Sequence, residues 1–177
     1  ADRYFFVNAG LGFDVELSGF TDIGNSGAAR QSIVKYLSKL LIDFRKFNPI
    51  PLVIKVDDKT FIASPLLARF ALKDIGGAKA DSGANHARID LKIVPQIKFS
   101  EAARKMKGLL RGTFDSIEGF KNIPASGTLE VERTDSGLLH ADGESFLAGT
   151  KFEVSLLTNA LKVWQGAMPP LPHTNAG

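Results

Sequence analysis

Apolar residues recur at helical spacing in two stretches of the chain. In residues 28–47 they fall three or four positions apart, while Lys and Arg occupy the remaining surface. The apolar members are Ile33, Leu37, Leu40, Leu41 and Phe44. Asn48-Pro49 ends this pattern, because proline disfavours helical backbone in the residue before it. Phe99–Leu110 is the second stretch, with Ser100 as its expected N-cap and Gly112 just beyond its end. The pattern predicts two principal helices, Ala28–Phe47 and Phe99–Leu110.

Short apolar or β-branched stretches between Gly- and Asp-rich turns fill most of the remaining chain and predict strands. The expected strands are Arg3–Asn8, Pro51–Val56, Phe61–Ala63, Ile89–Val94, Phe114–Ile123, Thr128–Arg133, Leu138–Leu139, Lys151–Leu157 and Ala160–Trp164. Leu66–Leu72 fits a strand or a short helix, and Gly19–Gly27 is expected to be a loop. Many short strands with few helices predict a mainly β (α+β) fold, either an antiparallel sandwich or a distorted barrel.

Composition narrows the protein class. The chain has 177 residues, of which 44% are hydrophobic and 23% charged, which is typical of a soluble globular domain. No apolar run approaches the roughly 18–20 residues that span a bilayer, and cysteine is absent. We expect one domain over residues 1–166 and a flexible tail over 167–177. Because the chain begins with Ala1 and enters an expected strand at Arg3, we also expect it to be part of a longer protein.

The net charge of +3 is too small to favour one class of partner by itself. No run of five or six consecutive Lys/Arg occurs, so the sequence does not favour nucleic acid as a partner. A small basic excess is equally compatible with simple solubility and with weak affinity for an anionic membrane surface.

The residues that could form a catalytic or metal-binding site include Asp142-Gly143-Glu144. This motif follows a predicted strand and a Thr-Asp-Ser-Gly turn. Glycine between two acids permits a tight corner that brings both carboxylates together. Such a corner can supply a general base or a metal site. Asp-Gly is also a common hairpin turn, and these residues by themselves leave both interpretations open.

A second motif lies near the start of the chain. The run Tyr4-Phe5-Phe6-Val7-Asn8-Ala9-Gly10-Leu11-Gly12-Phe13-Asp14, taken with Asp142-Gly143-Glu144, resembles the C-terminal domain of the diacylglycerol kinase and sphingosine kinase family of lipid kinases. The resemblance spans roughly residues 3–164. It implies a two-layer antiparallel β-sandwich that packs against its own N-terminal ATP-binding domain. That domain carries a Gly-Gly-Asp-Gly phosphate loop, and no such run occurs in this sequence.

The resemblance also implies roles for the acidic residues. Glu144 is similar to the general base that takes the proton of the lipid hydroxyl, and Asp142 would orient the corner or help to hold Mg²⁺. Asp14 would contact the polar head of the lipid. Each residue has a plainer alternative: Glu144 as a surface glutamate, Asp142 as a turn former, and Asp14 as a turn cap.

Three further residues of the first motif complete the expected substrate site. Gly10 and Gly12 would allow positive φ or close approach of another segment, and Asn8 would tie down the turn. The 13 Phe residues fit ordinary core filling. A sharper interpretation places some of the apolar side chains around a slot for an acyl chain. These are Phe5, Phe6, Phe13, Phe20, Leu37 and Leu41.

The segment Asn85-His86-Ala87 departs from the family. Related bacterial lipid kinases have an acidic, glycine-containing turn here that holds a structural Mg²⁺. Because imidazole is a poor ligand for magnesium, we infer that this metal site is lost. His86, His140 and His173 show no metal-ligand spacing, and no metal is expected on this chain.

The resemblance therefore predicts an ATP- and Mg²⁺-dependent kinase for a lipid hydroxyl, diacylglycerol-like or sphingoid-like. The isolated chain is expected to be inactive. Expected partners are the lipid, the N-terminal domain and an anionic membrane contacted weakly from the cytoplasm. The sequence leaves the oligomeric state open between a monomer and a homodimer. The alternatives are a non-catalytic lipid-binding or membrane-docking module and a relative of NAD kinase, although Asp142-Gly143-Glu144 argues against the latter.

Overall fold

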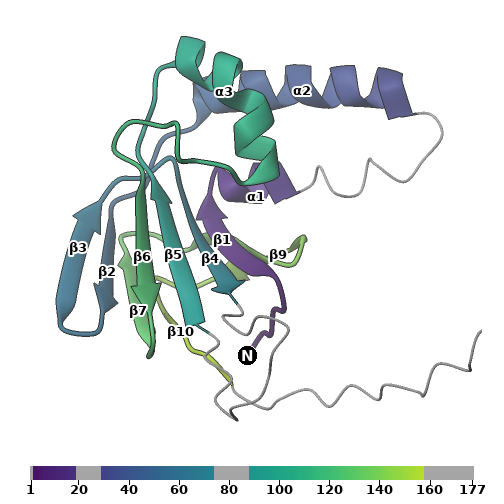
Figure 1. Ribbon diagram of the computed structural model, residues 1–177. Coiled ribbons are helices and arrows are strands. Elements are labelled where there is room, and N and C mark those ends of the chain that lie inside the picture. The colour runs from purple at the N-terminus through teal and green to yellow at the C-terminus, as the bar shows by residue number, and fades with distance from the viewer. Residues whose placement is uncertain (1, 19–28, 74–87, 158–177) are drawn as a thin grey trace, which may run out of the picture.

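The computed structural model describes residues 2–18, 29–73 and 88–157. Its strands are β1 (Asn8–Gly12), β2 (Leu52–Val56), β3 (Lys59–Ala63), β4 (Leu67–Lys73), β5 (Arg88–Val94), β6 (Lys121–Ala125), β7 (Leu129–Arg133), β8 (Gly137–Ala141), β9 (Glu144–Ala148) and β10 (Lys151–Val154). They form a six-stranded sheet in the order β6-β5-β4-β1-β8-β9 and a four-stranded sheet in the order β10-β7-β2-β3 (Figure 1). All pairings are antiparallel. The predicted two-layer, mainly β sandwich is confirmed.

One hydrophobic core lies between the two sheets. Alternation along each strand supplies it, since successive side chains of a strand point to opposite faces. Ile89, Leu91 and Ile93 of β5 enter this core, as do Ile54 of β2 and Val131 of β7, all of them buried. The alternation that predicted β5 therefore corresponds to the side chains that this strand buries between the sheets.

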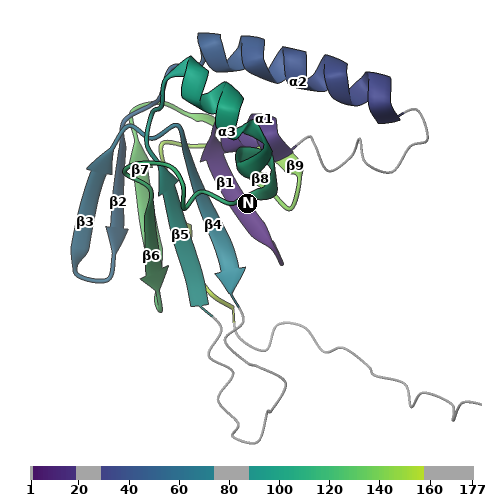
Figure 2. The same cartoon turned by 45° about the horizontal axis from the view of Figure 1, so that its top comes forward.

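Three helices gather at one end of the sandwich, α1 (Asp14–Ser18), α2 (Ala29–Lys46) and α3 (Phe99–Arg111) (Figure 2). A second core forms beneath them, with Phe13, Leu40 and Leu109 buried in it. The two predicted helices are confirmed, whereas α1 was not anticipated. None of the described helices is long and apolar enough to cross a membrane.

The ends of α3 are partly as expected. Gly112 takes the left-handed conformation at φ 69°, and its N–H closes the helix on the carbonyls of Gly108 and Leu109. The prediction of Ser100 as N-cap is wrong, because the cap position is Lys98, whose side chain makes no capping bond.

The first strand is shifted from its predicted position. We expected Arg3–Asn8, but the strand starts at Asn8, and Phe6 and Val7 are largely exposed. The apolar residues that enter the core are Ala9 and Leu11, which alternate with glycines. Aromatic content misled the prediction, because the N–H groups of Phe6 and Val7 donate to the side chain of Asp142. Only the carbonyl of Val7 bonds to a strand, accepting from Leu72 of β4 at 3.0 Å.

Other boundaries differ as well. Of Phe114–Ile123, only Lys121 onward is strand, since the preceding residues form successive turns closed by Ile117 and Phe120. The two-residue strand Leu138–Leu139 extends over Gly137–Ala141, and β9 was not anticipated. The strand at Lys151 ends at Val154, and Leu66–Leu72 is a strand. The loop at 19–27, the turn at 85–87, the strand at 160–164 and the tail lie outside the described residues.

Candidate functional site

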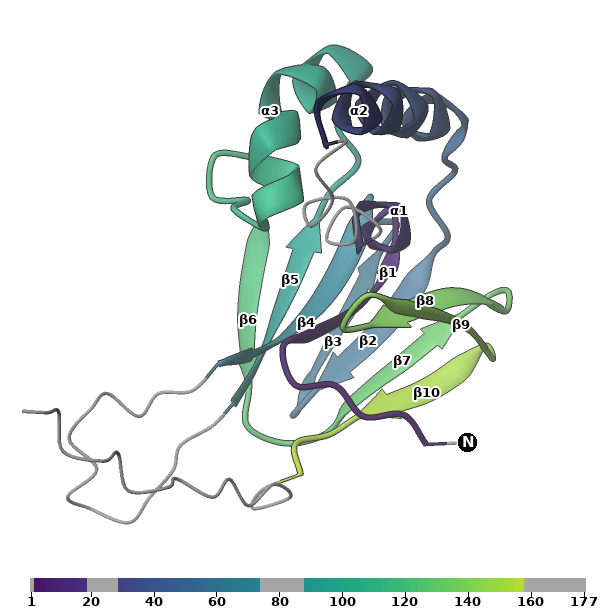
Figure 3. The ribbon, with the colours of Figure 1, turned by 90° about the vertical axis from the view of Figure 1, so that its right-hand side faces the viewer.

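The acidic motif forms the turn of the β8–β9 hairpin. Asp142 and Gly143 are its two loop residues, with φ of 47° and 94°. Positive φ at both positions matches the right-handed twist of the flanking strands and explains the Asp-Gly pair. The turn interpretation is thus correct for the backbone. Figure 3 shows the hairpin beside β1, the strand of the other motif.

Asp142 fastens this turn to the segment that leads into β1. Its carboxylate accepts hydrogen bonds from the backbone N–H groups of Phe6 (2.5 Å), Val7 (2.9 Å) and Asn8 (2.8 Å). Its own N–H donates to the carbonyl of Asn8 at 2.8 Å. Three N–H donors occupy both carboxylate oxygens, so Asp142 has a positioning role in this structure. The two sequence motifs therefore meet at one corner of the sheet.

Glu144 is the free acid of the corner. It is the first residue of β9, opposite Ala141 in register, and its side chain is exposed. Within the described residues its carboxylate has no hydrogen bond or ion pair. The hairpin geometry thus holds the backbone of Glu144 in place and leaves its carboxylate free to accept a proton or to bind a donor.

Asp14 lies elsewhere, as the buried first residue of α1. The side chain has no solvent exposure and is held by Arg69 of β4, whose Nε lies 2.9 Å from Oδ1 and 3.0 Å from Oδ2. Arg69 Nη2 also bonds Oδ1. His140 Nε2 lies 2.7 Å from Oδ2. A carboxylate without solvent needs such partners, because burying an unpaired charge is costly. Asp14 therefore has its acceptor sites filled by protein donors.

The buried cluster Asp14–Arg69–His140 depends on a glycine. Gly10 pairs with both Arg69 and His140 in register, and it leaves room for the cluster above it. A Cβ at this position would stand 2.0 Å from Asp14 Oδ2 and 2.7 Å from His140 Nε2. Gly12 has φ 74° and lies against the carbonyl of Leu66. Both glycines therefore serve close approach, as the sequence predicted, although here they accommodate protein atoms.

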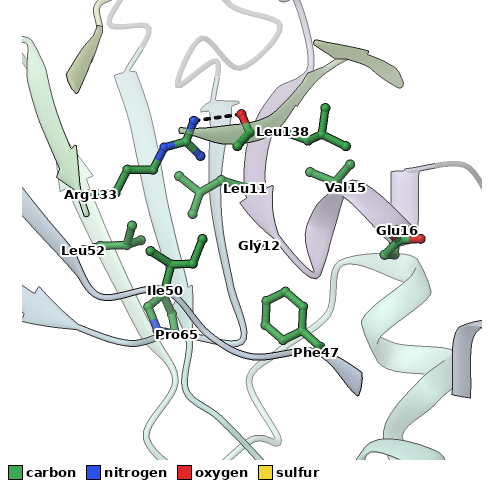
Figure 4. Close-up of a pocket in the computed structure, with 11 residues that line it drawn as sticks. Leu11, Gly12, Val15, Glu16, Phe47, Ile50, Leu52, Pro65, Arg133 and Leu138 are labelled. Carbon is green, nitrogen blue, oxygen red and sulfur yellow. Dashed lines mark hydrogen bonds between the residues drawn. The ribbon is translucent and has the colours of Figure 1, made fainter. Parts of the chain in front are cut away.

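An apolar pocket opens between the two sheets, near α1. It has a volume of about 200 Å³ and draws its walls from both sheets, α1 and the segment after α2 (Figure 4). The lining residues are Leu11, Gly12, Val15, Glu16, Phe47, Ile50, Leu52, Pro65, Arg133, Gly137 and Leu138. Among the described side chains that were expected around an acyl slot, none lines this pocket, and Phe20 lies outside the described residues. Phe13 and Leu37 instead pack in the core beneath the helices.

Arg133 is the charged wall of this pocket. It is 6% exposed, and its guanidinium donates to three backbone carbonyls, namely Gly149 from Nε (3.0 Å) and Gly137 and Ala148 from Nη2 (2.8 and 2.6 Å). Burial lowers the pKa of Arg133. These bonds tie the end of β7 to the strands β8 and β9.

Neither arginine was anticipated. The signal for Arg69 is a charge inside the apolar run Leu66–Leu72, since a charged residue in a buried strand needs a partner. His140, which shows no metal-ligand spacing in the sequence, belongs to the buried cluster. Its Nδ1 is buried and has no hydrogen-bond partner among the described residues. No sequence signal distinguishes Arg133 from an exposed strand end.

The described residues offer little to a metal ion. No three His, Asp or Glu side chains among them lie close enough together to hold one. Asp90 is buried, and its carboxylate accepts from Arg88 Nε at 2.7 Å. Asn85, His86 and Ala87 lie outside the described part of the chain.

Comparison with known proteins gives a likeness of fold. No family model and no curated protein sequence matches the chain. Three solved structures from Bacillus anthracis strain Sterne resemble it in fold. Two are of a presumed diacylglycerol kinase: one has a TM-score of 0.47 and 15% identity and covers 85% of this chain and 50% of that one, and the other has a TM-score of 0.44 and 16% identity and covers 85% and 48%. The third is of a diacylglycerol kinase, with a TM-score of 0.46 and 16% identity, covering 86% of this chain and 51% of that one.

This chain thus spans about half the length of the solved structures that it matches. The chain is similar in fold to part of a diacylglycerol kinase.

Proposed function

We propose that this chain is the substrate-side domain of a lipid kinase that transfers the γ-phosphate of ATP to a lipid hydroxyl. One observation carries the proposal: Asp142 of the second motif bonds the backbone that leads into the first, and Glu144 stays free beside it. A lipid kinase needs such an exposed, well-positioned acid at the edge of its substrate domain. The lipid would be diacylglycerol-like or sphingoid-like.

Glu144 would act as the general base. Its carboxylate accepts the proton of the lipid hydroxyl as that oxygen forms a bond to the γ-phosphorus and the bond to the bridging oxygen of ADP breaks. Asp142 positions this base by fixing the turn. ATP and Mg²⁺ would be held mainly by a separate domain, because this sequence has no Gly-Gly-Asp-Gly run and Asp142 and Asp90 are already occupied by donors.

The apolar pocket suits the chain of such a lipid. Leu138, in its wall, is three residues from Ala141, the partner of Glu144 in register. Three residues of strand span about 10 Å. Side chains three residues apart on a strand point to opposite faces of the sheet. A lipid whose hydroxyl lies at Glu144 would therefore have to pass the β9 edge to place its apolar chain in the pocket.

A second candidate function is a lipid-binding module without catalysis. The pocket favours it, because its described lining is mostly apolar. Such a module would bind an amphiphile in the pocket and would not depend on Glu144.

Substitution of Glu144 in the full-length protein separates the two. In an assay of radiolabelled phosphate transfer from ATP to lipid, Glu144→Gln should lower kcat by about 10²–10⁴, the usual contribution of a general base. The thermal midpoint should change little, since the side chain is exposed. Glu153→Gln, at an exposed position of β10, is the matched control. Full activity of Glu144→Gln would remove Glu144 from the mechanism. Absence of phosphoryl transfer in the parent full-length protein, with lipid still bound, would overturn the kinase proposal and leave the binding module.

A further inference from the structure

The apolar pocket contains a positive charge without a negative partner. No carboxylate among the described residues lies within ion-pair distance of Arg133, and the only acid in the pocket wall, Glu16, pairs with Lys39 at 3.5 Å. An arginine stays protonated even when buried. The three backbone carbonyls bonded to Arg133 supply dipoles but no charge. The pocket therefore has a net charge that an anion would balance.

One nitrogen of this guanidinium is available. Nε and Nη2 are both used on carbonyls, whereas Nη1 has no acceptor among the described residues. Figure 4 shows the guanidinium reaching over Leu11, inside the ring of lining residues. Because Arg133 lines the pocket, Nη1 can donate to a ligand there, in a space whose other walls are mostly apolar side chains. Such a combination recognises an acceptor group attached to a hydrocarbon.

The size of the pocket limits the ligand. A volume of about 200 Å³ holds roughly seven groups of the size of a water molecule, at about 30 Å³ each. This suits one medium-length alkyl chain, and it is below the roughly 300–1,000 Å³ typical of drug-sized ligands. A carboxylate matches the single charge of Arg133, while a phosphate would bury an excess of negative charge and an ammonium would be repelled.

We propose that this pocket binds a medium-chain fatty acid, with the carboxylate on Arg133 Nη1 and the alkyl chain against Leu11, Leu52 and Phe47. The inference goes beyond the proposed phosphoryl transfer, because it concerns binding to this chain alone and does not involve Glu144. If both hold, a fatty acid occupies the space that the lipid chain needs.

Titration of the 177-residue chain with three eight-carbon probes tests the head group. Calorimetry should give binding of octanoate roughly ten- to a hundredfold tighter than that of 1-octanol, since a hydrogen bond to a charged group has about that effect. Octylamine should not bind. Equal affinity for octanoate and octanol, tighter binding of octylamine, or no binding of octanoate would overturn the proposal.

Two matched variants test whether octanoate binds in this pocket. Leu138 lines the pocket, and Leu147, its partner in register on β9, does not. Both are exposed, so neither change should prevent folding. Leu138→Trp should weaken octanoate binding at least tenfold and Leu147→Trp should leave it unchanged. Equal effects would place the binding elsewhere and overturn the proposal.

Substitution of the arginine completes the set. Arg133→Met should abolish the preference for octanoate over octanol, provided that its circular dichroism matches that of the parent chain. Arg133 also donates to three backbone carbonyls, so its loss can prevent folding. In that case the Leu138→Trp and Leu147→Trp variants decide whether octanoate binds in this pocket. A folded Arg133→Met that keeps the full preference would show that another cation recognises the carboxylate. Phosphoryl transfer by the full-length protein is measured separately, so failure of either proposal leaves the other intact.

Discussion

Asn8 and Asp142 exchange hydrogen bonds in both directions across 134 positions of sequence. The N–H of Asn8 donates to Asp142 Oδ1 at 2.8 Å, and the N–H of Asp142 donates to the carbonyl of Asn8, also at 2.8 Å. This reciprocal pair joins the first strand to the β8–β9 turn. It explains why an aromatic N-terminal segment that is not a strand is nevertheless held in place.

Asp142→Asn should therefore weaken the fold at this corner. Asparagine tolerates the positive φ of the turn, but its amide has one acceptor oxygen for three N–H donors. We expect a loss of about 1–3 kcal/mol in the free energy of unfolding, measured with urea, since charged acceptors contribute that much. Asp58→Asn, at an exposed turn between β2 and β3, is the control and should change stability little. Equal stability of the two variants would contradict a positioning role for Asp142.

Gly10→Ala should disrupt the buried cluster Asp14–Arg69–His140. The new Cβ would stand 2.0 Å from Asp14 Oδ2, so the carboxylate must move away from its partners. Overpacking of this kind costs about 1–3 kcal/mol, and here it also disturbs a buried ion pair. Gly149→Ala, where nothing lies within 4 Å of the new atom, is the matched control. The midpoint of thermal unfolding is measured for both variants. Equal midpoints for Gly10→Ala and Gly149→Ala would contradict the close approach of Asp14 to Gly10.

Tyr36 gives a pH dependence in the alkaline range. Burial, and next the charge of Glu16, raise the pKa of Tyr36 to about 12, and its hydroxyl donates to the carbonyl of Glu16. A phenol in the unfolded chain titrates near pH 10. The stabilising contribution is thus complete below about pH 10 and is lost as pH rises to about 12, because the unfolded state ionises first.

Phenolate absorbance of the Tyr4→Phe variant measures this shift, since Tyr4 and Tyr36 are the only two tyrosines. The midpoint should lie near pH 12, and Glu16→Gln should lower it. A midpoint near pH 10 in the folded protein would show that Tyr36 is not held as described.

Membrane contact would come from α2. Lys35 and Lys46 are exposed and have no ion-pair partner among the described residues, whereas Lys39 pairs with Asp43 at 2.6 Å and Arg45 lies over the ring of Phe99 at 4.2 Å. Each free cation near an anionic leaflet contributes about 1 kcal/mol within a Debye length. The chain should sediment weakly with phosphatidylserine vesicles and be released at high salt.

A double variant tests that surface. Lys35→Gln/Lys46→Gln should lower the bound fraction roughly tenfold or more at limiting lipid, from two contributions of about 1 kcal/mol each. Lys59→Gln/Lys121→Gln changes the net charge equally on exposed residues of β3 and β6. If both double variants lose binding to the same extent, only the net charge matters and α2 has no docking role.

The sequence was most informative where the apolar residues repeat with a single helical or strand period. The helical spacing of Leu37, Leu40, Leu41 and Phe44 predicted α2 within one residue at each end. The alternation in Ile89–Val94 predicted β5, which starts one residue earlier. Such patterns succeed because a single apolar face must be buried.

Long-range pairing could not be predicted in this way. Nothing local shows that Asp142 would accept N–H groups from residues 6–8, or that Asp14 would be enclosed by Arg69 and His140. The motif resemblance located Glu144 and Asp142 together, but their different roles depend on which carboxylate meets donors in three dimensions. The pocket at Arg133 combines segments from both sheets, so no single stretch of sequence contains it.

The position of β1 has a consequence for how the chain folds. This first strand pairs with β4 on one side and with β8 on the other, so neither of its partners is its neighbour along the chain. During synthesis its second edge stays uncovered until β8 (Gly137–Ala141) has been made. Pairing of such distant segments slows folding, and an uncovered edge invites association with other chains. The β8–β9 hairpin therefore completes the fold as well as carrying the acidic corner.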